Sequence, residues 1–228
     1  GPHAPLAHGI GWEFHDPDVE RFVEIYSMWG ASDDRQSPLA PLRVRAGNVE
    51  GTMSANELLA AGAKLGFTGG GDCHEGRAGF TCEDPTGQGT TTHTFAAGLP
   101  YRCGMTAAVM ADLDRSCLIR ALRNRRTYAT TGARILLDFE AAGLPMGSAG
   151  TAQKVLCRAE VHALEPIERL EIIKDGKVAF LQAGDGADAN LAWQDPDPPS
   201  REHYYYLRVV QADGQMAWSS PVWIRPAR

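Results

Sequence analysis

The chain has 228 residues, a formal net charge of −6, 43% hydrophobic residues and 22% charged residues. This composition is typical of one large globular domain or two small ones. The acidic balance argues against a surface that binds nucleic acid or an anionic membrane, so we expect neither partner. No apolar run approaches the roughly 20 residues that span a bilayer. The opening residues GPHAP are too polar for a secretory signal, and, because no Met begins the sequence, we expect a piece of a longer protein.

The cysteines do not predict a disulfide framework. Their number is odd, their spacing is irregular and no CxxC pair suggests a zinc ribbon. A single disulfide between Cys82 and Cys103 is left open, so the cytoplasm and the periplasm both stay open as locations. The five cysteines are Cys73, Cys82, Cys103, Cys117 and Cys157.

The first part of the chain alternates between strand and helix signals. Residues 21–27 form an apolar stretch of strand length. Ser54 and Glu57 have the spacing of a capping box and predict the start of a helix that ends near Gly66. Residues 67–69 then predict a short buried strand. This order favours an α/β arrangement for the first part of the chain.

A long segment rich in Gly and Thr, residues 76–111, separates these elements from a second predicted helix. Segments of this length in a compact domain are usually functional or disordered. Asp112 or Asp114 can cap the second helix, and arginines gather at its C-terminal end, where the helix dipole favours cations. Residues 127–132 predict a packed turn. The apolar face of the helix is predicted to consist of Leu113, Cys117, Leu118, Ala121 and Leu122.

After Gly132 the helix signals stop and strand signals replace them. Asp175-Gly176 and Asp213-Gly214 each provide a hairpin turn between two strand patterns. We therefore predict that residues 133–228 form a β-sandwich. The predicted strands cover residues 135–140, 154–162, 167–174, 177–181, 204–212 and 216–224.

The sequence GFTGGGDCHEGR, residues 66–77, carries the clearest chemical signal. If the strand continues to its end, Asp72 and His74 project from one face and Cys73 from the other. A carboxylate beside an imidazole suits Zn, Mn or Fe, whereas Cys73 and His74 cannot form a nucleophilic dyad across opposite faces. On spacing alone, polar residues that merely close a loop remain the alternative interpretation.

Further polar residues support a site near this motif. His3 and His8 flank an apolar turn, and Glu24 interrupts an apolar strand, where a buried carboxylate needs a partner. Arg77 follows the motif and can bind an anionic substrate oxygen through two hydrogen bonds.

Four sequence segments together resemble the PHP (polymerase and histidinol phosphatase) superfamily of metallohydrolases, within a PHP-like group that includes carbaryl-hydrolase-type enzymes. They are PHAPLAHGIGW, VEIYSMWGASD, LGFTGGGDCHEGRAG and ALRNRRTYATTGARILLDF, which occur in this order and cover about residues 2–140. The resemblance implies that residues 1–132 are the C-terminal portion of a distorted (β/α) barrel, and that residues 133–228 follow as the β-sandwich.

The resemblance also implies a site with two or three divalent transition metal ions, Zn, Mn or Fe. Asp72 and His74 match the last ligand motif of the family, while His3, or alternatively His8, matches the preceding one. Glu24 matches an acidic residue near the site. The early ligands of the family have no counterpart in residues 1–228, so an N-terminal barrel half on the same native chain, or a separate subunit, is expected to supply them.

The function expected from this resemblance is metal-dependent hydrolysis of small-molecule esters, with phosphate esters as the first choice. Asp72, Glu24 and Arg77 are the predicted catalytic residues. Carbamate or carboxyl-ester hydrolysis is one alternative. The other is a non-catalytic fragment whose sandwich binds carbohydrate or protein through Trp193, Trp218 and Trp223.

Overall fold

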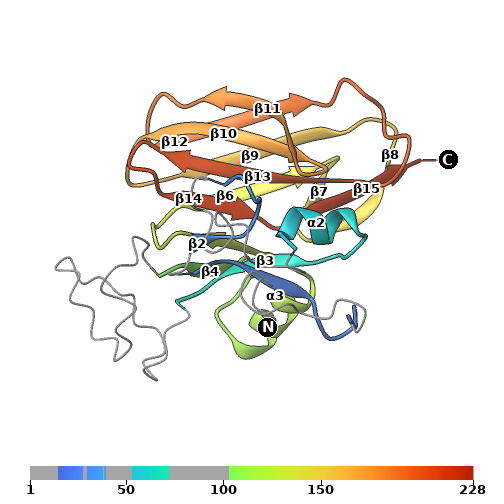
Figure 1. Ribbon diagram of the computed structural model, residues 1–228, viewed down its shortest axis with the longest axis horizontal. Coiled ribbons are helices and arrows are strands. Elements are labelled where there is room, and N and C mark those ends of the chain that lie inside the picture. Colours follow the sequence, from blue (N-terminus) through green and yellow to red (C-terminus); the bar gives the residue numbers. More distant parts are fainter. Residues whose placement is uncertain (1–14, 28–29, 38, 40–52, 72–102, 228) are drawn as a thin grey trace.

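The computed structural model describes residues 15–27, 30–37, 39, 53–71 and 103–227. They form three layered sheets and two short helices, which lie at the right and at the base of the molecule in Figure 1. We call these layers the N-terminal sheet, the central sheet and the outer sheet. Within the described residues, neither helix has the length and apolar character required to cross a membrane.

The N-terminal sheet has the order β2-β1-β3. Strands β1 (Phe22–Ser27) and β3 (Gly66–Gly69) are parallel, and β2 (Gly30–Ala31) pairs antiparallel with β1. Helix α2 (Ala55–Ala60) lies on the connection between β1 and β3. The predicted order of strand, helix and strand is therefore confirmed, although the helix ends earlier than predicted.

The central sheet has eight strands and forms the middle layer. Its main path runs β11-β10-β13-β14-β5-β4, and β15 pairs with both β13 and β8. Helix α3 (Arg115–Arg123) connects β4 to β5. The strands are β4 (Met105–Ala108), β5 (Thr127–Thr130), β8 (Ala149–Ala152), β10 (Ile167–Lys174), β11 (Lys177–Ala183), β13 (His203–Gln211), β14 (Met216–Ser219) and β15 (Val222–Pro226).

The outer sheet covers one face of the central sheet and completes a β-sandwich, which confirms that part of the prediction. Its order is β12-β9-β6-β7. The core between the two sheets includes Phe139, Val161, Leu170 and Leu207, all nearly inaccessible to solvent. The strands are β6 (Leu136–Ala141), β7 (Leu144–Pro145), β9 (Leu156–His162) and β12 (Asp188–Gln194).

The other face of the central sheet is covered by the N-terminal sheet and α2. Strand β13 shows this arrangement most clearly, because its side chains alternate between two hydrophobic cores. Tyr205 and Leu207 belong to the sandwich core, whereas Tyr204 and Tyr206 join a second core with Phe67 of β3. A strand covered on both faces needs buried side chains at successive positions rather than an alternating pattern.

The predicted barrel is wrong for the described residues, which contain three layered sheets and no barrel. The βαβ signal was real, because β1 and β3 are parallel and adjacent. The next strands do not extend this parallel sheet. Instead, β4 and β5 pair antiparallel with each other, and β5 pairs antiparallel with β14 near the end of the chain. These long-range antiparallel pairings replace the parallel neighbours that a barrel requires.

Several local predictions can be checked directly. Asp175 and Gly176 both have positive φ, 50° and 77°, as a two-residue type I′ hairpin requires, and so confirm the predicted turn. Asp114 is the N-cap of α3. Residues 127–130 are strand β5 rather than the predicted packed turn, because their ladder partners on β14 lie almost 90 positions away and leave no local signal.

Candidate functional site

Of the six residues that the sequence predicted for the site, Glu24 alone lies within the described ranges. His3, His8, Asp72, His74 and Arg77 lie outside the described residues. The site is therefore built here from Glu24 and the side chains around it. The role of Glu24 stays a prediction, but the structure gives the chemistry of its surroundings.

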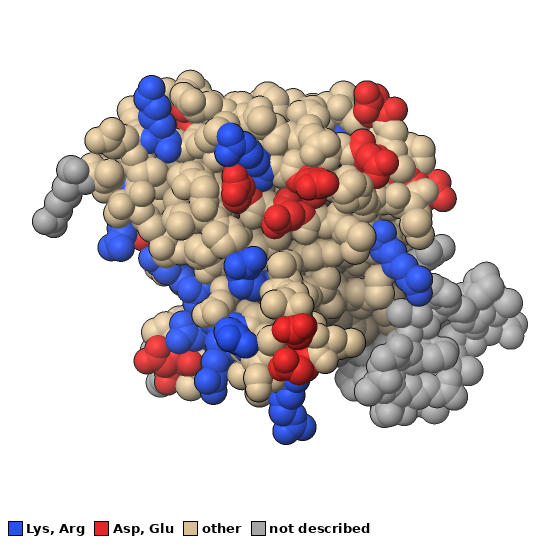
Figure 2. Space-filling model, turned by 180° about the vertical axis from the view of Figure 1, so that it is seen from behind, with Lys and Arg blue, Asp and Glu red and all other residues tan. Residues whose placement is uncertain are grey.

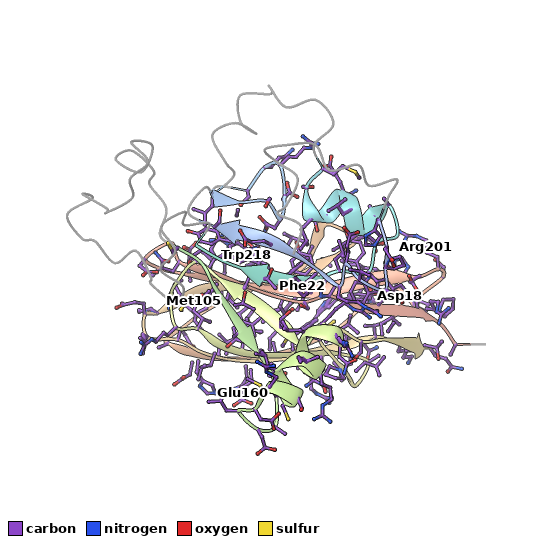
Figure 3. The ribbon with its side chains drawn as sticks, turned by 90° about the horizontal axis from the view of Figure 1, so that it is seen from below. Asp18, Phe22, Met105, Glu160, Arg201 and Trp218 are labelled. Atoms are coloured by element: carbon purple, nitrogen blue, oxygen red, sulfur yellow. The ribbon has the colours of Figure 1, made fainter. Side chains whose placement is uncertain are left out.

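Glu24 lines a pocket of about 370 Å³, which we call the Glu24 pocket. The alternation of β1 explains how its carboxylate comes to lie there. Val23 and Ile25 are completely buried in the second core, so Phe22 and Glu24 project from the opposite face of the strand into the pocket. Figure 3 labels Phe22 on β1 and Met105 at the start of β4, two strands that contribute to the pocket.

The carboxylate of Glu24 lies against the backbone at the end of β3. A β-carbon added to Gly70 would lie 2.6 Å from Oε2 of Glu24, which is closer than real β-carbon contacts allow. Glycine at position 70 thus makes room for the carboxylate. This is a physical reason for at least one of the three consecutive glycines, which precede Asp72 in the sequence.

The remaining walls come from β3, β4 and α3. Thr68 and Gly69 contribute from β3, and Thr106 from β4. The hydroxyl of Thr106 accepts from the Gly69 amide at 3.0 Å and donates to the Gly69 carbonyl at 2.7 Å, so both of its roles are occupied. Helix α3 adds Leu118 and Leu122, which lie one turn apart on the same face.

The β1–β3 ladder contains a register shift next to the Glu24 pocket. The shift lies between Glu24 and Tyr26. It accompanies a change of side, because Tyr26 is buried and stacks on Trp218 at a ring distance of 5.9 Å. β-Bulges commonly re-aim side chains next to functional sites in this way.

A buried ionic cluster fixes the N-terminal sheet to the central sheet. Asp33, which follows β2, is completely buried. Its Oδ2 accepts hydrogen bonds from Nη1 of Arg208 at 3.1 Å and from the indole nitrogen of Trp218 at 3.0 Å. Arg208 also donates to Glu171, so one guanidinium serves two carboxylates. Burial raises the pKa of Asp33, and the charge of Arg208 opposes this rise only in part.

One other group of side chains could hold a metal ion by distance. Asp112, Asp114 and Cys117 each offer a ligand atom, and within the described residues these atoms lie within 4.8 Å of one another. The helix cap explains this closeness, because Asp114 accepts a hydrogen bond from the Cys117 amide at 2.7 Å. These hydrogen bonds also lower the pKa of Asp114. None of these three residues is among those predicted to bind metal.

The tryptophans that the sequence suggested as ligand contacts are largely internal. Trp218 is completely buried and Trp223 nearly so. Trp193 is half-buried at the edge of the sandwich, where it stacks on Phe180 at 5.7 Å. The described structure thus gives no exposed aromatic platform among these three residues.

Sequence reasoning missed the residues that surround Glu24. Leu118 and Leu122 were predicted on an apolar helix face, but helical spacing does not tell whether that face meets a core or a cavity. Thr106 belonged to a segment that was expected to be a loop. Only the alternation within residues 22–25 carried a readable signal, since it puts Phe22 on the same face as Glu24.

Comparison with known proteins identifies long relatives without an assigned activity. No family model matches the chain. A protein of Chlamydia pneumoniae is 32% identical over 242 residues, which cover 97% of this chain and 37% of the relative. Proteins of Chlamydia trachomatis serovar D and Chlamydia muridarum are 32% and 33% identical, and all three are named uncharacterised. The chain therefore spans little more than a third of the length of these relatives.

Solved structures give only distant similarities. The fibronectin(III)-like modules of Clostridium thermocellum CbhA align with a TM-score of 0.29 and 12% identity, over 39% of this chain and 93% of that one. A lytic polysaccharide monooxygenase of Jonesia denitrificans aligns with a TM-score of 0.31 and 14% identity, over 77% and 95% of the two chains. Similarities at this level carry no argument about function.

Proposed function

We propose that this chain contributes the substrate pocket of a hydrolase that acts on small uncharged esters, either carbamates or carboxyl esters. The charge of the Glu24 pocket supports this choice. Its described lining contains one carboxylate and no Lys or Arg, and the other lining groups are apolar or hydroxyl-bearing. Its volume of about 370 Å³ suits a small molecule, because ligand sites usually measure about 300–1,000 Å³.

Phosphate esters fit this lining less well than uncharged esters do. A phosphate monoester carries nearly two negative charges at neutral pH. Protein sites for such groups supply arginine, lysine or the amide groups of a helix N-terminus. In the Glu24 pocket a phosphate would instead meet the carboxylate of Glu24, and like charges repel strongly near apolar walls. We therefore place the uncharged esters ahead of the phosphate esters.

Glu24 has the chemistry required of a general base. A carboxylate beside a substrate can orient a water molecule and accept its proton, a contribution of about 10²–10⁴-fold in rate. The described residues fit a divalent metal in one respect, since Glu24 offers an oxygen ligand against Gly70, two positions before Asp72 in the sequence. In our proposal Asp72 and His74, with His3 or His8, hold such an ion, which would lower the pKa of a bound water.

Three naphthyl compounds with one leaving group test the proposal. The purified chain, supplied with Mn²⁺ or Zn²⁺, is assayed for release of 1-naphthol from 1-naphthyl acetate, 1-naphthyl N-methylcarbamate and 1-naphthyl phosphate. We expect turnover of the acetate or the carbamate and little of the phosphate. Glu24→Gln should lower kcat/KM by about 100-fold or more, while the exposed Glu165→Gln should leave it unchanged.

The same assay tests the role of the metal and distinguishes the alternative functions. Asp72→Ala combined with His74→Ala should abolish both turnover and the retention of metal during purification. Faster hydrolysis of the phosphate than of the acetate and the carbamate would overturn our order of substrates. If the chain hydrolyses none of the three compounds in the presence of Mn²⁺ or Zn²⁺, the hydrolase proposal fails for this chain and the non-catalytic alternative is favoured.

A further inference from the structure

The Glu24 pocket is polar at one side and apolar at another. Glu24 provides its charged group, held against Gly70 at the end of β3. Leu118 and Leu122 of α3 provide an apolar wall, together with Phe22 of β1. A ligand that satisfies both sides must carry a group that complements a carboxylate, joined to an apolar body.

We infer that the Glu24 pocket binds small molecules in which an N–H donor, in the strongest case a protonated amine, is attached to a compact apolar group. The inference rests on the proposed function in one respect, namely that this pocket receives the substrate. It goes further because it names the part of the substrate that Glu24 recognises. Among uncharged esters it favours those that carry an N–H group, such as carbamates, over esters that have only acceptors.

The hydrogen-bonding capacity of the lining supports a donor on the ligand. An ionised carboxylate is an acceptor only and has sites for about four hydrogen bonds. Thr106 offers no spare donor, because its hydroxyl proton already points to the Gly69 carbonyl. Thr68, the other hydroxyl of the lining, offers one donor, so a ligand N–H or ammonium group can occupy further acceptor sites of Glu24, and charge-assisted bonds of this kind are about twice as strong as neutral ones.

Helix α3 supports the apolar body of the ligand. Leu118 has 40% of its surface exposed although it lines the pocket. A nine-residue helix that buries only Cys117 and Ala121 well leaves this apolar surface to be covered. Figure 2 shows the molecule from behind, with Lys and Arg side chains gathered in its lower half. The apolar lining of the pocket contrasts with such charged surface.

Benzylamine, benzyl alcohol and benzoate provide matched probes, because they share a ring and differ in the group offered to Glu24. Binding to the purified chain is measured at neutral pH by NMR titration. We expect protonated benzylamine to bind most tightly and benzoate not to bind. Glu24→Gln should weaken benzylamine by about tenfold or more and leave benzyl alcohol nearly unchanged, since only the charged pair is lost.

Two further variants separate the polar side from the apolar side. Leu122→Ala should weaken benzylamine and benzyl alcohol alike, whereas Ile119→Ala, on the same helix but outside the lining, should weaken neither. Gly70→Ala places a methyl group 2.6 Å from the present position of Glu24 Oε2 and should displace the carboxylate. It should therefore reproduce the loss of benzylamine binding in a protein that still contains Glu24. Thermal denaturation confirms that each variant is folded.

The outcomes distinguish this inference from the proposed function. Binding of benzylamine that depends on Glu24, without hydrolysis of any naphthyl ester, would support the inference and contradict the hydrolase. Ester hydrolysis without such binding would support the hydrolase and contradict the inference. Benzoate binding as tightly as benzylamine, an unchanged affinity in folded Glu24→Gln, or no binding of any probe would each overturn the inference.

Discussion

Asp33 joins the N-terminal sheet to the central sheet through buried polar contacts. It is inaccessible to solvent, and its Oδ2 takes both available donors, Arg208 and Trp218. Among the described residues its other oxygen, Oδ1, has no hydrogen-bond partner. Arg208 is also shared with Glu171. Glu171 also binds Arg169, at 2.7 Å, so the charged form of Asp33 is costly mainly because the carboxylate is completely buried.

The pH dependence of folding should reveal this cost. Because burial raises the pKa of Asp33 above the usual 3.8, the folded protein holds this proton more tightly than the unfolded chain. The stability that results is complete below about pH 3.8 and is lost as the pH rises through the folded-state pKa. The loss is at most about 1.4 kcal/mol per pH unit. We expect Asp33→Asn to lack this loss, so it should gain stability relative to wild type as the pH rises.

Urea unfolding at several pH values between 3 and 8 measures this difference. The side-chain amide introduced by Asp33→Asn keeps one oxygen for Arg208 and Trp218, so the variant should fold. Asp185→Asn, at an exposed position, is the matched control and should show no such trend. A wild type that becomes more stable than Asp33→Asn with rising pH would contradict our reading of the cluster.

At the scale of elements, strand β3 is joined to the central sheet by side-chain hydroxyls. The Phe67 amide donates to the Ser220 hydroxyl at 2.8 Å, and the Thr127 hydroxyl donates to the Phe67 carbonyl at 2.9 Å. Thr106 bonds both backbone groups of Gly69 in the same manner. Hydroxyl groups thus take the place of a backbone ladder along this edge of β3, which would otherwise leave polar groups unpaired.

Removing these hydroxyls should have unequal effects. Thr127 is completely buried, so Thr127→Val leaves the Phe67 carbonyl without water or partner and should lower the free energy of unfolding by about 1–3 kcal/mol. Thr106 lies at the pocket and is exposed, so water can replace its hydroxyl and Thr106→Val should cost less. Chemical denaturation checks both, with the exposed Thr151→Val as control. Equal costs for all three variants would refute the role of the hydroxyls.

Helix α2 should depend on its cap, because it has only six residues. The Ser54 hydroxyl accepts from the Glu57 amide, and the Glu57 carboxylate accepts from the Ser54 amide at 2.6 Å. Ser54→Ala should lower the free energy of unfolding by about 1 kcal/mol. Ser54→Asp should restore most of the loss, since aspartate also caps helices well. A similar loss in both variants would mean that the burial of Ser54, not capping, decides the effect.

Local signals predicted most elements, whereas long-range pairing escaped the sequence. The alternation in residues 167–174 and the Asp175-Gly176 turn gave β10 and its hairpin directly. By contrast, β5 joins the central sheet through partners close to the C-terminus, and no local pattern encodes such a partner. The same limit explains the wrong barrel prediction. A βαβ unit shows that two strands are parallel, but not what the next strand will join.

Within the described residues, Glu24 is the part of the candidate site that the sequence predicted. A carboxylate within an apolar strand is a strong signal, because burying it demands a compensating contact. The apolar wall from Leu118 and Leu122 depends on how α3 lies over β4, which is a tertiary fact. The role of Gly70 depends equally on a side chain that lies 46 positions earlier. The sequence pattern therefore pointed to a residue that lines the pocket without describing the cavity around it.

For the molecule as a whole, the central sheet makes the described residues one structure. Strands from both sides of residue 132 belong to this sheet, and its two faces carry the two hydrophobic cores. Tyr206 and Trp218 are buried only because the N-terminal sheet and α2 cover them. We therefore expect that the residues on the two sides of residue 132 do not fold independently of each other.

The fragment 133–228 should not fold stably by itself. It lacks β4 and β5, so β14 becomes an open edge, and it exposes the aromatic side chains of the second core. We expect aggregation or a broad, non-cooperative thermal transition, whereas residues 1–228 should melt in one step. Size-exclusion chromatography and circular dichroism measure both properties. A monomeric fragment with a sharp transition would instead support an autonomous sandwich.

The buried cluster around Asp33 also sets an order of events during protein synthesis. Its partners follow it by 175 and 185 positions in the chain. At translation speeds of about 5–20 residues per second, Trp218, whose indole donates to Asp33, leaves the ribosome roughly 10 to 40 s after Asp33 does. Until then β1, β2 and β3 lack the face of the central sheet against which they pack. The segment that carries Asp33 therefore reaches its final place only after the strands that supply Arg208 and Trp218 have been made.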